Sequence, residues 1–177
     1  MTTRDKTHDR LTRHLGRLYG YAISLCQDPE EAKGLVQECA LKALAARNPP
    51  DDPAAHRAWL FKILRNGFLD RLRRKAVRES AAELIAAEQV PGEYWAADER
   101  LISVLTVKLE LARLPQSHRE IIGLIDIAGL SYGEAAEALE VPAGTVMSRI
   151  SRARAALMAA IAEGPVRVLP LKERKSS

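Results

Sequence analysis

Residues 139–157 contain the pattern that most constrains the fold, because they describe a helix with one apolar side and one side rich in hydroxyl and guanidinium groups. At about 100° per residue, the apolar side chains fall on one narrow stripe, formed by Val146, Ile150, Ala153 and Leu157. The opposite side carries Ser148, Ser151, Arg152 and Ala155, with Arg149 and Arg154 on its flanks. This polar side has no carboxylate and suits a groove lined with phosphates.

A capping signal precedes this helix and marks the start of a shorter one. Ser131 and Glu134 have the S-x-x-E spacing of a capping box, in which the serine hydroxyl accepts from the glutamate amide and the carboxylate reaches back. The short helix breaks near residues 141–144, where Pro142 suits a first helical turn and Gly144 adds backbone freedom. The pattern predicts a helix-turn-helix whose second helix can enter a major groove, although a packed helical hairpin would show the same pattern.

Two further helix starts are marked by their capping residues. Ser117 and Glu120 have the spacing of a second capping box, and Gly129 predicts the end of that helix. Asp28 followed by Pro29 predicts another start, with the aspartate as N-cap and the proline in the first turn. The acids that follow Pro29 lie near the positive end of the helix dipole, which stabilises them.

The N-terminal half is predicted to form three amphipathic helices between residues 5 and 76, because apolar residues recur there at three- and four-residue steps. Prolines between residues 49 and 53 separate the second helix from the third. The predicted inner residues of the three helices are, in order, Leu11, Leu15, Leu18, Ala22 and Leu25; Ala32, Leu35, Val36, Cys39, Ala40, Ala43 and Leu44; and Trp59, Leu60, Ile63, Leu64, Phe68 and Leu72. No strand-like alternation of useful length occurs, so we expect an all-α fold of two small helical domains.

Charge is distributed unevenly along the chain, although the formal net charge is only +4. Basic residues dominate from residue 57 to 78, with Asp70 as the single acid, whereas residues 79–99 carry six acids and no basic residue. A basic block, an acidic spacer and a basic-sided helix fit two DNA-contacting modules joined by a segment that avoids DNA. Solvated helix surfaces would give each block the same charges, so this alternative stays open for any one block.

The sequence lacks the motifs of catalysis, metal binding and membrane insertion. The two cysteines, Cys26 and Cys39, lie among apolar residues with no histidine at ligand spacing, which indicates buried thiols. There is no H-x-x-x-H pattern, no nucleophile with a base, no paired carboxylates and no glycine-rich phosphate loop. No apolar run approaches about 18 residues, and no signal peptide is visible. We therefore expect a soluble cytoplasmic protein that is not an enzyme and has no cofactor, metal or membrane insertion.

Two sets of short motifs occur in a fixed order along the chain. Between Leu114 and Leu157 they are LP, RE, GLSY, an alanine-rich helix, GTV, SR and RAR, and after residue 57 they are AWLF, I-x-x-N and a terminal Arg-Arg. Together these motifs resemble the two domains of the small extracytoplasmic-function sigma factors of bacterial RNA polymerase. The resemblance implies a region 2-like domain at residues 5–76, an acidic linker at 77–100, a region 4-like helix-turn-helix domain at 101–162 and a mobile tail at 163–177.

In that family, the helix containing AWLF melts and recognises the minus 10 promoter element. The resemblance implies that Asn66, together with the loop from Arg47 to His56, forms a pocket for an extruded base, because an amide can both donate to and accept from a base edge. Trp59 is expected in the core, because it lies on one stripe with Ile63. The full set of residues implied at the minus 10 element, with the cations holding phosphates, is Lys62, Arg65, Asn66, Asp70, Arg71, Arg73 and Arg74.

The resemblance also implies that the polar side of the helix at residues 142–157 recognises the minus 35 element. Arg152 is expected to contact a base, because arginine can donate two hydrogen bonds to guanine. Met147 and Ser151 stand where family members often carry a basic and a bulkier residue, which leaves the promoter sequence open. The implied minus 35 residues are Ser148, Ser151 and Arg152 toward bases, and Thr145, Arg149 and Arg154 toward phosphates.

Core RNA polymerase is the partner implied for the second helix. By resemblance, Leu35, Val36, Gln37 and Glu38 would contact the clamp helices of the largest polymerase subunit, while the beta flap would be a second contact of the factor. The family usually has an acidic pair before this segment, but the present chain has Lys33-Gly34. Losing two negative charges weakens an electrostatically steered interface, and a glycine lowers helix propensity by about 1 kcal/mol.

These implications define a first hypothesis and an alternative. The first is an alternative sigma factor that binds core polymerase, directs it to minus 35 and minus 10 elements and assists melting, with an anti-sigma factor as the expected inhibitor. The alternative is a sigma-like mimic that sequesters an anti-sigma factor without directing transcription. Two arginine-rich surfaces favour the first hypothesis, because a mimic needs neither. An independent helix-turn-helix repressor would leave the N-terminal motifs unexplained.

Overall fold

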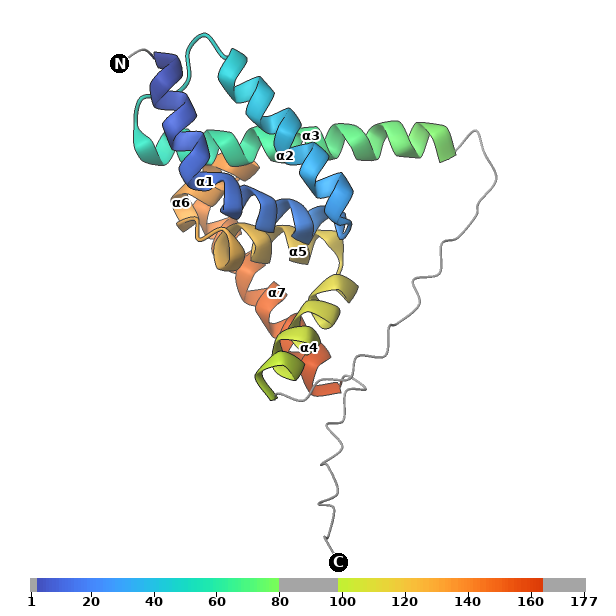
Figure 1. The fold of residues 1–177 in the computed structure, drawn as a ribbon. Helices are drawn as coiled ribbons and strands as arrows, with labels where there is room; N and C mark the ends of the chain where they lie inside the picture. Colours follow the sequence, from blue (N-terminus) through green and yellow to red (C-terminus); the bar gives the residue numbers. More distant parts are fainter. Residues whose placement is uncertain (1–2, 80–98, 164–177) are drawn as a thin grey trace, which may run out of the picture.

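The computed structural model describes residues 3–79 and 99–163, which form seven α-helices and one short π-helix and contain no strand. The all-α prediction is therefore confirmed. Most of the predicted linker and the predicted tail beyond residue 163 lie outside the described residues. Figure 1 shows the first three helices on one side of the molecule and the C-terminal helices packed beneath them.

The N-terminal domain consists of α1 (Thr3–Cys26), α2 (Pro29–Ala45) and α3 (Pro53–Glu79). Asp28 caps α2, since its carboxylate accepts a hydrogen bond from the Glu31 amide at 2.7 Å, which confirms the predicted start. α3 continues past the predicted domain end at residue 76. The apolar sides of the three helices meet in a core formed by Leu11, Leu18, Tyr21, Ala22, Leu25, Ala32, Leu35, Cys39, Ala43, Leu60, Phe61, Leu64 and Phe68.

The C-terminal domain consists of α4 (Glu99–Arg113), α5 (Gln116–Ile122), the π-helix η1 (Gly123–Ile127), α6 (Tyr132–Leu139) and α7 (Ala143–Glu163). The predicted capping box at the start of α6 is confirmed, because Ser131 and Glu134 bond reciprocally. Gly129 has a φ of 70°, which lets the chain turn after η1 and confirms the predicted end. α6 and α7 pack on each other and on the preceding helices, so that they form the predicted helix-turn-helix.

Two local predictions differ from the structure. The capping box at Ser117 is wrong: α5 begins at Gln116 after Pro115, which makes no side-chain cap bond, and the Glu120 carboxylate instead accepts from Arg65 at 2.7 Å. The prediction that Leu15 is a core residue is also wrong, because its side chain is 38% exposed. Tyr21 completes the buried stripe of α1 in its place.

The two domains are in direct contact. α3 packs along α6, and α1 packs on η1 and α5, as the neighbouring ribbons in Figure 1 show. Arg119 of α5 donates to the backbone carbonyl of Ser24 at the end of α1, and Gln27 donates to that of Ala112. The residues implied at the minus 10 element and those implied at the minus 35 element therefore lie on two domains that pack directly on each other.

Candidate nucleic-acid interface

α7 exposes the polar side that the sequence predicts. Val146, Ile150 and Ala153 are buried against α5 and α6, with exposed fractions of 0%, 2% and 0%. Burial of this stripe fixes the rotation of the helix, so the opposite side faces solvent. The implied minus 35 residues Ser148, Arg149, Ser151, Arg152 and Arg154 are exposed and Thr145 is half-buried.

Hydrogen bonds distinguish the side chains of this surface. The Ser148 hydroxyl donates to the Thr145 carbonyl at 3.0 Å, and Arg152 Nε donates to the Ser148 carbonyl at 3.2 Å. Arg154 instead forms an ion pair with Asp126 of η1, with Nε 3.2 Å from Oδ2, and this hydrogen bond raises the pKa of Arg154. Arg152 can therefore turn toward a ligand at little cost, whereas Arg154 is already held by a carboxylate.

A shallow pocket of about 260 Å³ lies beside this surface. It is lined by Ser117 and His118 from the start of α5 and by Arg149 and Arg152 from α7. The sequence did not indicate that α5 borders the recognition helix, because these residues are more than 30 positions apart. The pocket continues the cationic surface of α7, because Arg149 and Arg152 form one side of it.

Some of the residues implied at the minus 10 element lie on the solvent-facing side of α3, whereas Lys62, Arg65, Asp70 and Arg71 are half-buried. Asn66, Arg73 and Arg74 are exposed. Asp70, the single acid of this basic block, accepts a hydrogen bond from Arg73 at 2.8 Å. The expectation that Trp59 belongs to the core agrees with its packing against the buried cluster and its edge contact with His56, whose ring centroid is 5.2 Å away.

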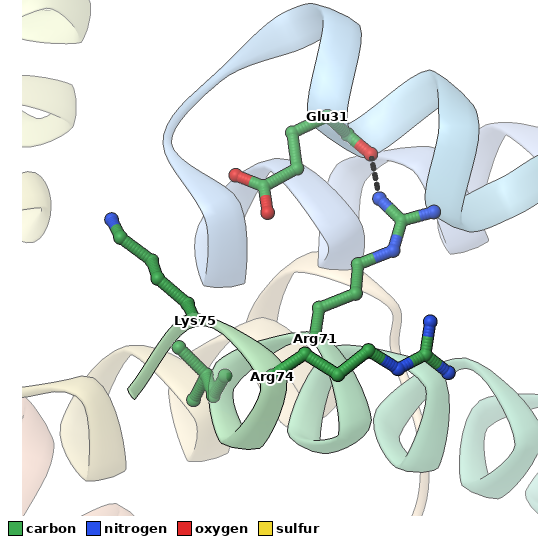
Figure 2. Close-up of a pocket in the computed structure, with 5 residues that line it drawn as sticks. Glu31, Arg71, Arg74 and Lys75 are labelled. Atoms are coloured by element: carbon green, nitrogen blue, oxygen red, sulfur yellow. Dashed lines mark hydrogen bonds between the residues drawn. The ribbon is translucent and has the colours of Figure 1, made fainter. Parts of the chain in front are cut away.

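The start of α2 and the C-terminal part of α3 border a basic pocket of about 390 Å³. Figure 2 shows the Arg71 guanidinium reaching from α3 to the Glu31 backbone carbonyl, to which it donates at 3.1 Å. Arg71 also donates to Glu38 at 3.3 Å, and the hydrogen bond from Lys42, followed by that from Arg71, lowers the pKa of Glu38. The pocket is lined by Glu31, Arg71, Leu72, Arg74 and Lys75.

Two of the implied minus 10 cations are paired with carboxylates of the C-terminal domain. Lys62 Nζ lies 2.7 Å from Glu140 Oε1, and Arg65 Nε lies 2.7 Å from Glu120 Oε1. The hydrogen bond from Lys62 lowers the pKa of Glu140. Sequence patterns could not reveal these pairs, because the partners are more than 50 residues apart.

A third pair, Arg57 with Glu134, lies in the same interface and is buried about as deeply as the Arg65 pair. Arg57 Nε donates to Glu134 Oε1 at 2.7 Å and a second guanidinium nitrogen donates to Oε2, which makes the pair bidentate. Burial acts to raise the pKa of Glu134, but hydrogen bonds from Arg57 and Ser131 outweigh it and lower the pKa. Glu134 therefore serves both the capping box of α6 and the contact between domains.

Asn66 and the loop before α3 do not come together as one base pocket. Asn66 lies about 20 Å along α3 from Pro53, at about 1.5 Å per residue, which is more than the width of one base. His56, at the end of the expected pocket, is 1% exposed, and its two imidazole nitrogens have no hydrogen-bond partner among the described residues. Arg10 of α1 holds the loop by donating to the carbonyls of Pro50 and Asp51 at 3.2 and 2.7 Å.

Fewer of the residues implied to contact polymerase on α2 are accessible than the sequence suggests. Leu35 is 1% exposed and belongs to the core, so it is not part of the accessible surface. Gln37 is exposed, while Val36 and Glu38 are half-buried. Leu41, one turn after Gln37 on the same side of the helix, is 70% exposed, which the sequence analysis missed. An apolar residue off the buried stripe is the signal that could have found it.

The sequence predicts buried thiols, and in the structure Cys39 is buried and Cys26 is half-buried. Burial raises the pKa of both thiols, Cys26 and Cys39, to about 12. Across residues 3–79 and 99–163 no group of three potential metal ligands comes together. None of the helices in those ranges is long and apolar enough to cross a membrane.

Comparison with known proteins places both domains in one family. The Sigma-70 region 2 model matches residues 11–78, and the Sigma-70 region 4 model matches residues 105–157. The chain is 34% identical over 164 residues to the ECF RNA polymerase sigma factor EcfG of Rhodopseudomonas palustris, covering 90% of this chain and 87% of that protein. It is 35% identical over 152 residues to SigE of Mycolicibacterium smegmatis, covering 82% of this chain and 58% of that protein.

Solved structures give the same result. The sigma factor RpoE of Bartonella quintana, in complex with the anti-sigma factor NepR, is 31% identical with a TM-score of 0.70 over 89% of this chain and 97% of that chain. CnrH, in complex with the cytosolic domain of CnrY, is 31% identical with a TM-score of 0.59 over 88% of this chain and 87% of that chain.

The fold and the two cationic surfaces define a two-domain helical DNA-binding protein. The family models and relatives make the assignment specific: the chain belongs to the extracytoplasmic-function sigma factors of bacterial RNA polymerase. It is an alternative sigma factor for transcription initiation and is not an enzyme.

Proposed function

We propose that this sigma factor directs core RNA polymerase to two-part promoters, with α7 at the minus 35 element and α3 at the minus 10 element. The observation that carries the proposal is the exposed side of α7, where hydroxyl and guanidinium groups stand together. Within α7 the first carboxylate is Glu163 at its last residue, so nothing on the helix opposes DNA phosphates along its first turns. Arg152 contacts a base and Arg149 a phosphate in this proposal.

At the minus 10 element, α3 binds and helps to open the duplex. Asn66, Arg73 and Arg74 are exposed, so an amide and two cations are available to a single strand. Lys62 and Arg65 join them once their carboxylate partners leave. The base captured by Asn66 differs from any base held by the loop before α3, because the two sites are far apart along the helix.

The exposed side of α2 binds core polymerase in this proposal. Gln37 and Leu41 lie one turn apart, and an apolar side chain that is 70% exposed suits a protein interface. Leu41→Asp should therefore weaken co-purification with core polymerase by at least about tenfold. The helical fold should be retained, because an exposed substitution changes stability little. Glu30→Gln, on the first turn of α2, is the control and should leave the interaction unchanged.

An anti-sigma factor is the proposed regulator, since the two solved relatives described above are complexes with NepR and with CnrY. The same likeness supports the alternative of a mimic that occupies an anti-sigma factor and never directs transcription. Lys33-Gly34, in place of the family's acidic pair, favours the mimic, whereas the two cationic surfaces favour the sigma factor. A cytoplasmic location follows from polymerase as the partner.

Reconstituted transcription tests the proposal. Purified chain added to core polymerase from its native cell should give promoter-specific transcripts. Arg152→Ala should abolish them through the minus 35 contact, and Asn66→Ala should reduce permanganate-reactive thymines at the start site through melting. Arg13→Ala, which removes an exposed cation from α1, is the matched control. Tight binding of an anti-sigma factor without any transcript would establish the mimic instead.

A further inference from the structure

α2 and α3 each place a glycine against a charged side chain of the other helix. A Cβ added at Gly34 of α2 would lie 3.5 and 3.6 Å from the two terminal guanidinium nitrogens of Arg71 on α3. A Cβ added at Gly67 of α3 would lie 3.1 Å from Leu35 Cδ1 and 3.9 Å from Glu38 Oε1 on α2. Within each helix the glycine precedes the charged residue by one turn, so both lie on one side of that helix. These two sides face each other.

The Arg71 guanidinium donates two hydrogen bonds to α2. One terminal nitrogen donates to the backbone carbonyl of Glu31 at 3.1 Å, as Figure 2 shows, and the other donates to the carboxylate of Glu38 at 3.3 Å. A helical carbonyl points toward the residues three and four positions later, so the lack of a side chain at Gly34 leaves the Glu31 carbonyl open to the guanidinium. Arg71 is therefore held by two acceptors, and its side chain is only 27% exposed.

Glu38 borders the exposed side of α2. It follows Gln37 directly, and the exposed Leu41 lies one turn further along the helix. Both of its carboxylate oxygens have a cationic partner, since Oε1 lies 2.8 Å from Lys42 Nζ and Oε2 accepts from Arg71. Its side chain is 32% exposed, and a carboxylate has lone pairs for further donors. Glu38 is thus fixed in place while it remains accessible from solvent.

From these contacts we infer that Arg71 is a positioning residue of the polymerase-binding surface and not a DNA contact, because it holds the Glu38 carboxylate where a cation of core polymerase can bind it. The family resemblance implies Arg71 at the minus 10 element, but a turn toward DNA would break both of its bonds to α2. Gly34, which stands in place of a family acid, makes room for the guanidinium. The polymerase part of this inference rests on the proposed function, whereas the pairing of Arg71 with Glu38 does not.

The pairing can be measured at the Glu38 carboxyl group. Carboxyl-carbon NMR of the full chain with labelled glutamate gives the pKa of each side chain, and the signal missing in Glu38→Gln assigns Glu38. Hydrogen bonds from Lys42 and from Arg71 lower the pKa of Glu38. Arg71→Ala should therefore raise this pKa, and Lys42→Ala should raise it further, since the Lys42 contact is the shorter one. Arg13→Ala, with the same change in charge on α1, should leave it unchanged.

Gly34→Val is the charge-neutral test of the pairing. Valine adds two γ-methyl groups next to a guanidinium that is already at contact distance from the Cβ, so Arg71 should be displaced and the pKa of Glu38 should rise. Gly34→Ala is the matched control, because its Cβ makes only ordinary contact and the pKa should stay as it is. Both substitutions improve helix propensity, so neither acts by weakening α2. An unchanged pKa of Glu38 in both Arg71→Ala and Gly34→Val would overturn the pairing.

Binding to core polymerase tests what the pair does. A fluorescent label on the full chain reports binding as core polymerase from the native cell is titrated in. Arg71→Ala and Glu38→Gln should each weaken binding by about fivefold, and the double variant should be no weaker than the weaker single variant, because both changes remove the same arrangement. Arg71→Lys should recover only part of the affinity, since an ammonium lacks the fork that reaches two acceptors. Arg13→Ala should bind as the native chain does.

Single-stranded DNA tests whether Arg71 contacts phosphate. The probe is a fluorescein-labelled strand of random sequence, titrated at several salt concentrations. Arg74→Ala, which removes an exposed cation one turn further along α3, should reduce the slope of log affinity against log salt by about 0.7, the value for one phosphate contact on a single strand. Arg71→Ala should keep the slope of Arg13→Ala. An equal loss of slope in Arg71→Ala and Arg74→Ala would overturn the positioning role.

Leu41→Asp separates failure of this inference from failure of the proposed function, because it alters the polymerase-binding surface without removing either member of the pair. If Leu41→Asp weakens polymerase binding but Arg71→Ala and Glu38→Gln do not, the positioning role is overturned and the surface stands. If none of the three variants weakens binding, the proposed polymerase surface is rejected together with the positioning role. A raised pKa of Glu38 in Arg71→Ala would then still establish the pair as a link between α2 and α3.

Discussion

Replacing Arg152 with alanine should weaken sequence-specific binding while leaving the fold unchanged. The Arg152 side chain is exposed and donates to the Ser148 carbonyl at 3.2 Å, a bond to a neutral group in solvent. Its loss should change the free energy of unfolding by less than about 0.5 kcal/mol. A bidentate arginine–guanine contact contributes about 1–3 kcal/mol, which corresponds to about 5- to 150-fold in affinity. The loss on DNA is therefore expected to be much larger than the loss in stability.

The assay compares a preferred duplex with an unselected one. Repeated selection from random duplexes gives the preferred sequence, and fluorescence anisotropy then gives the affinity for it and for the random pool. Arg152→Ala should weaken binding to the preferred duplex by the factor above and to the pool only slightly. Arg13→Ala has the same charge change and should weaken neither in a sequence-dependent way. Equal losses on both duplexes would mean that Arg152 contacts only phosphate, and the argument for base contact would fail.

Three further predictions concern the folded state. Ile150→Ala, at a position that is 2% exposed, should lower the free energy of unfolding by about 2–5 kcal/mol in urea titrations, whereas Met147→Ala, at 54% exposed, should change it by less than about 0.5 kcal/mol. Cys26 and Cys39, with pKa values of about 12, should react with iodoacetamide at pH 8 far more slowly than after unfolding, and equal rates would contradict their burial. Burial, followed by the charge of Arg10, lowers the pKa of His56 below 6.5. The contribution of the neutral imidazole to stability is therefore complete above pH 6.5 and declines as the pH falls below that value. His56→Gln should flatten this decline in thermal melts.

Local signals predicted most of the helix boundaries, because the chemistry of a cap lies within a few residues. Asp28 and the Ser131 capping box both behave as the sequence indicates. Apolar spacing also predicted the buried side of α7, and with it the solvent-facing side. The motif order predicted the family, which the family models confirm over both domains. The assignment of particular bases to particular residues stays a prediction.

Predictions from the sequence were wrong where the environment of a residue is set by a part of the chain that is distant in sequence. Ser117 and Glu120 have ideal spacing for a capping box, yet Glu120 pairs with Arg65 of the other domain. Leu15 fits the periodicity of α1, but Tyr21 takes its place in the core. Such outcomes depend on which surfaces meet after the helices form, and periodicity within one helix contains no information about that.

The most direct test of the account is a map of transcript starts. Core polymerase from the native cell transcribes its genomic DNA with and without the purified chain, and sequencing of the 5′ ends identifies the starts that depend on the chain. The account predicts new starts that share one motif at minus 35 and another at minus 10, and that disappear with Arg152→Ala. An unchanged set of starts, from polymerase that binds the chain, would contradict the claim that this protein directs transcription.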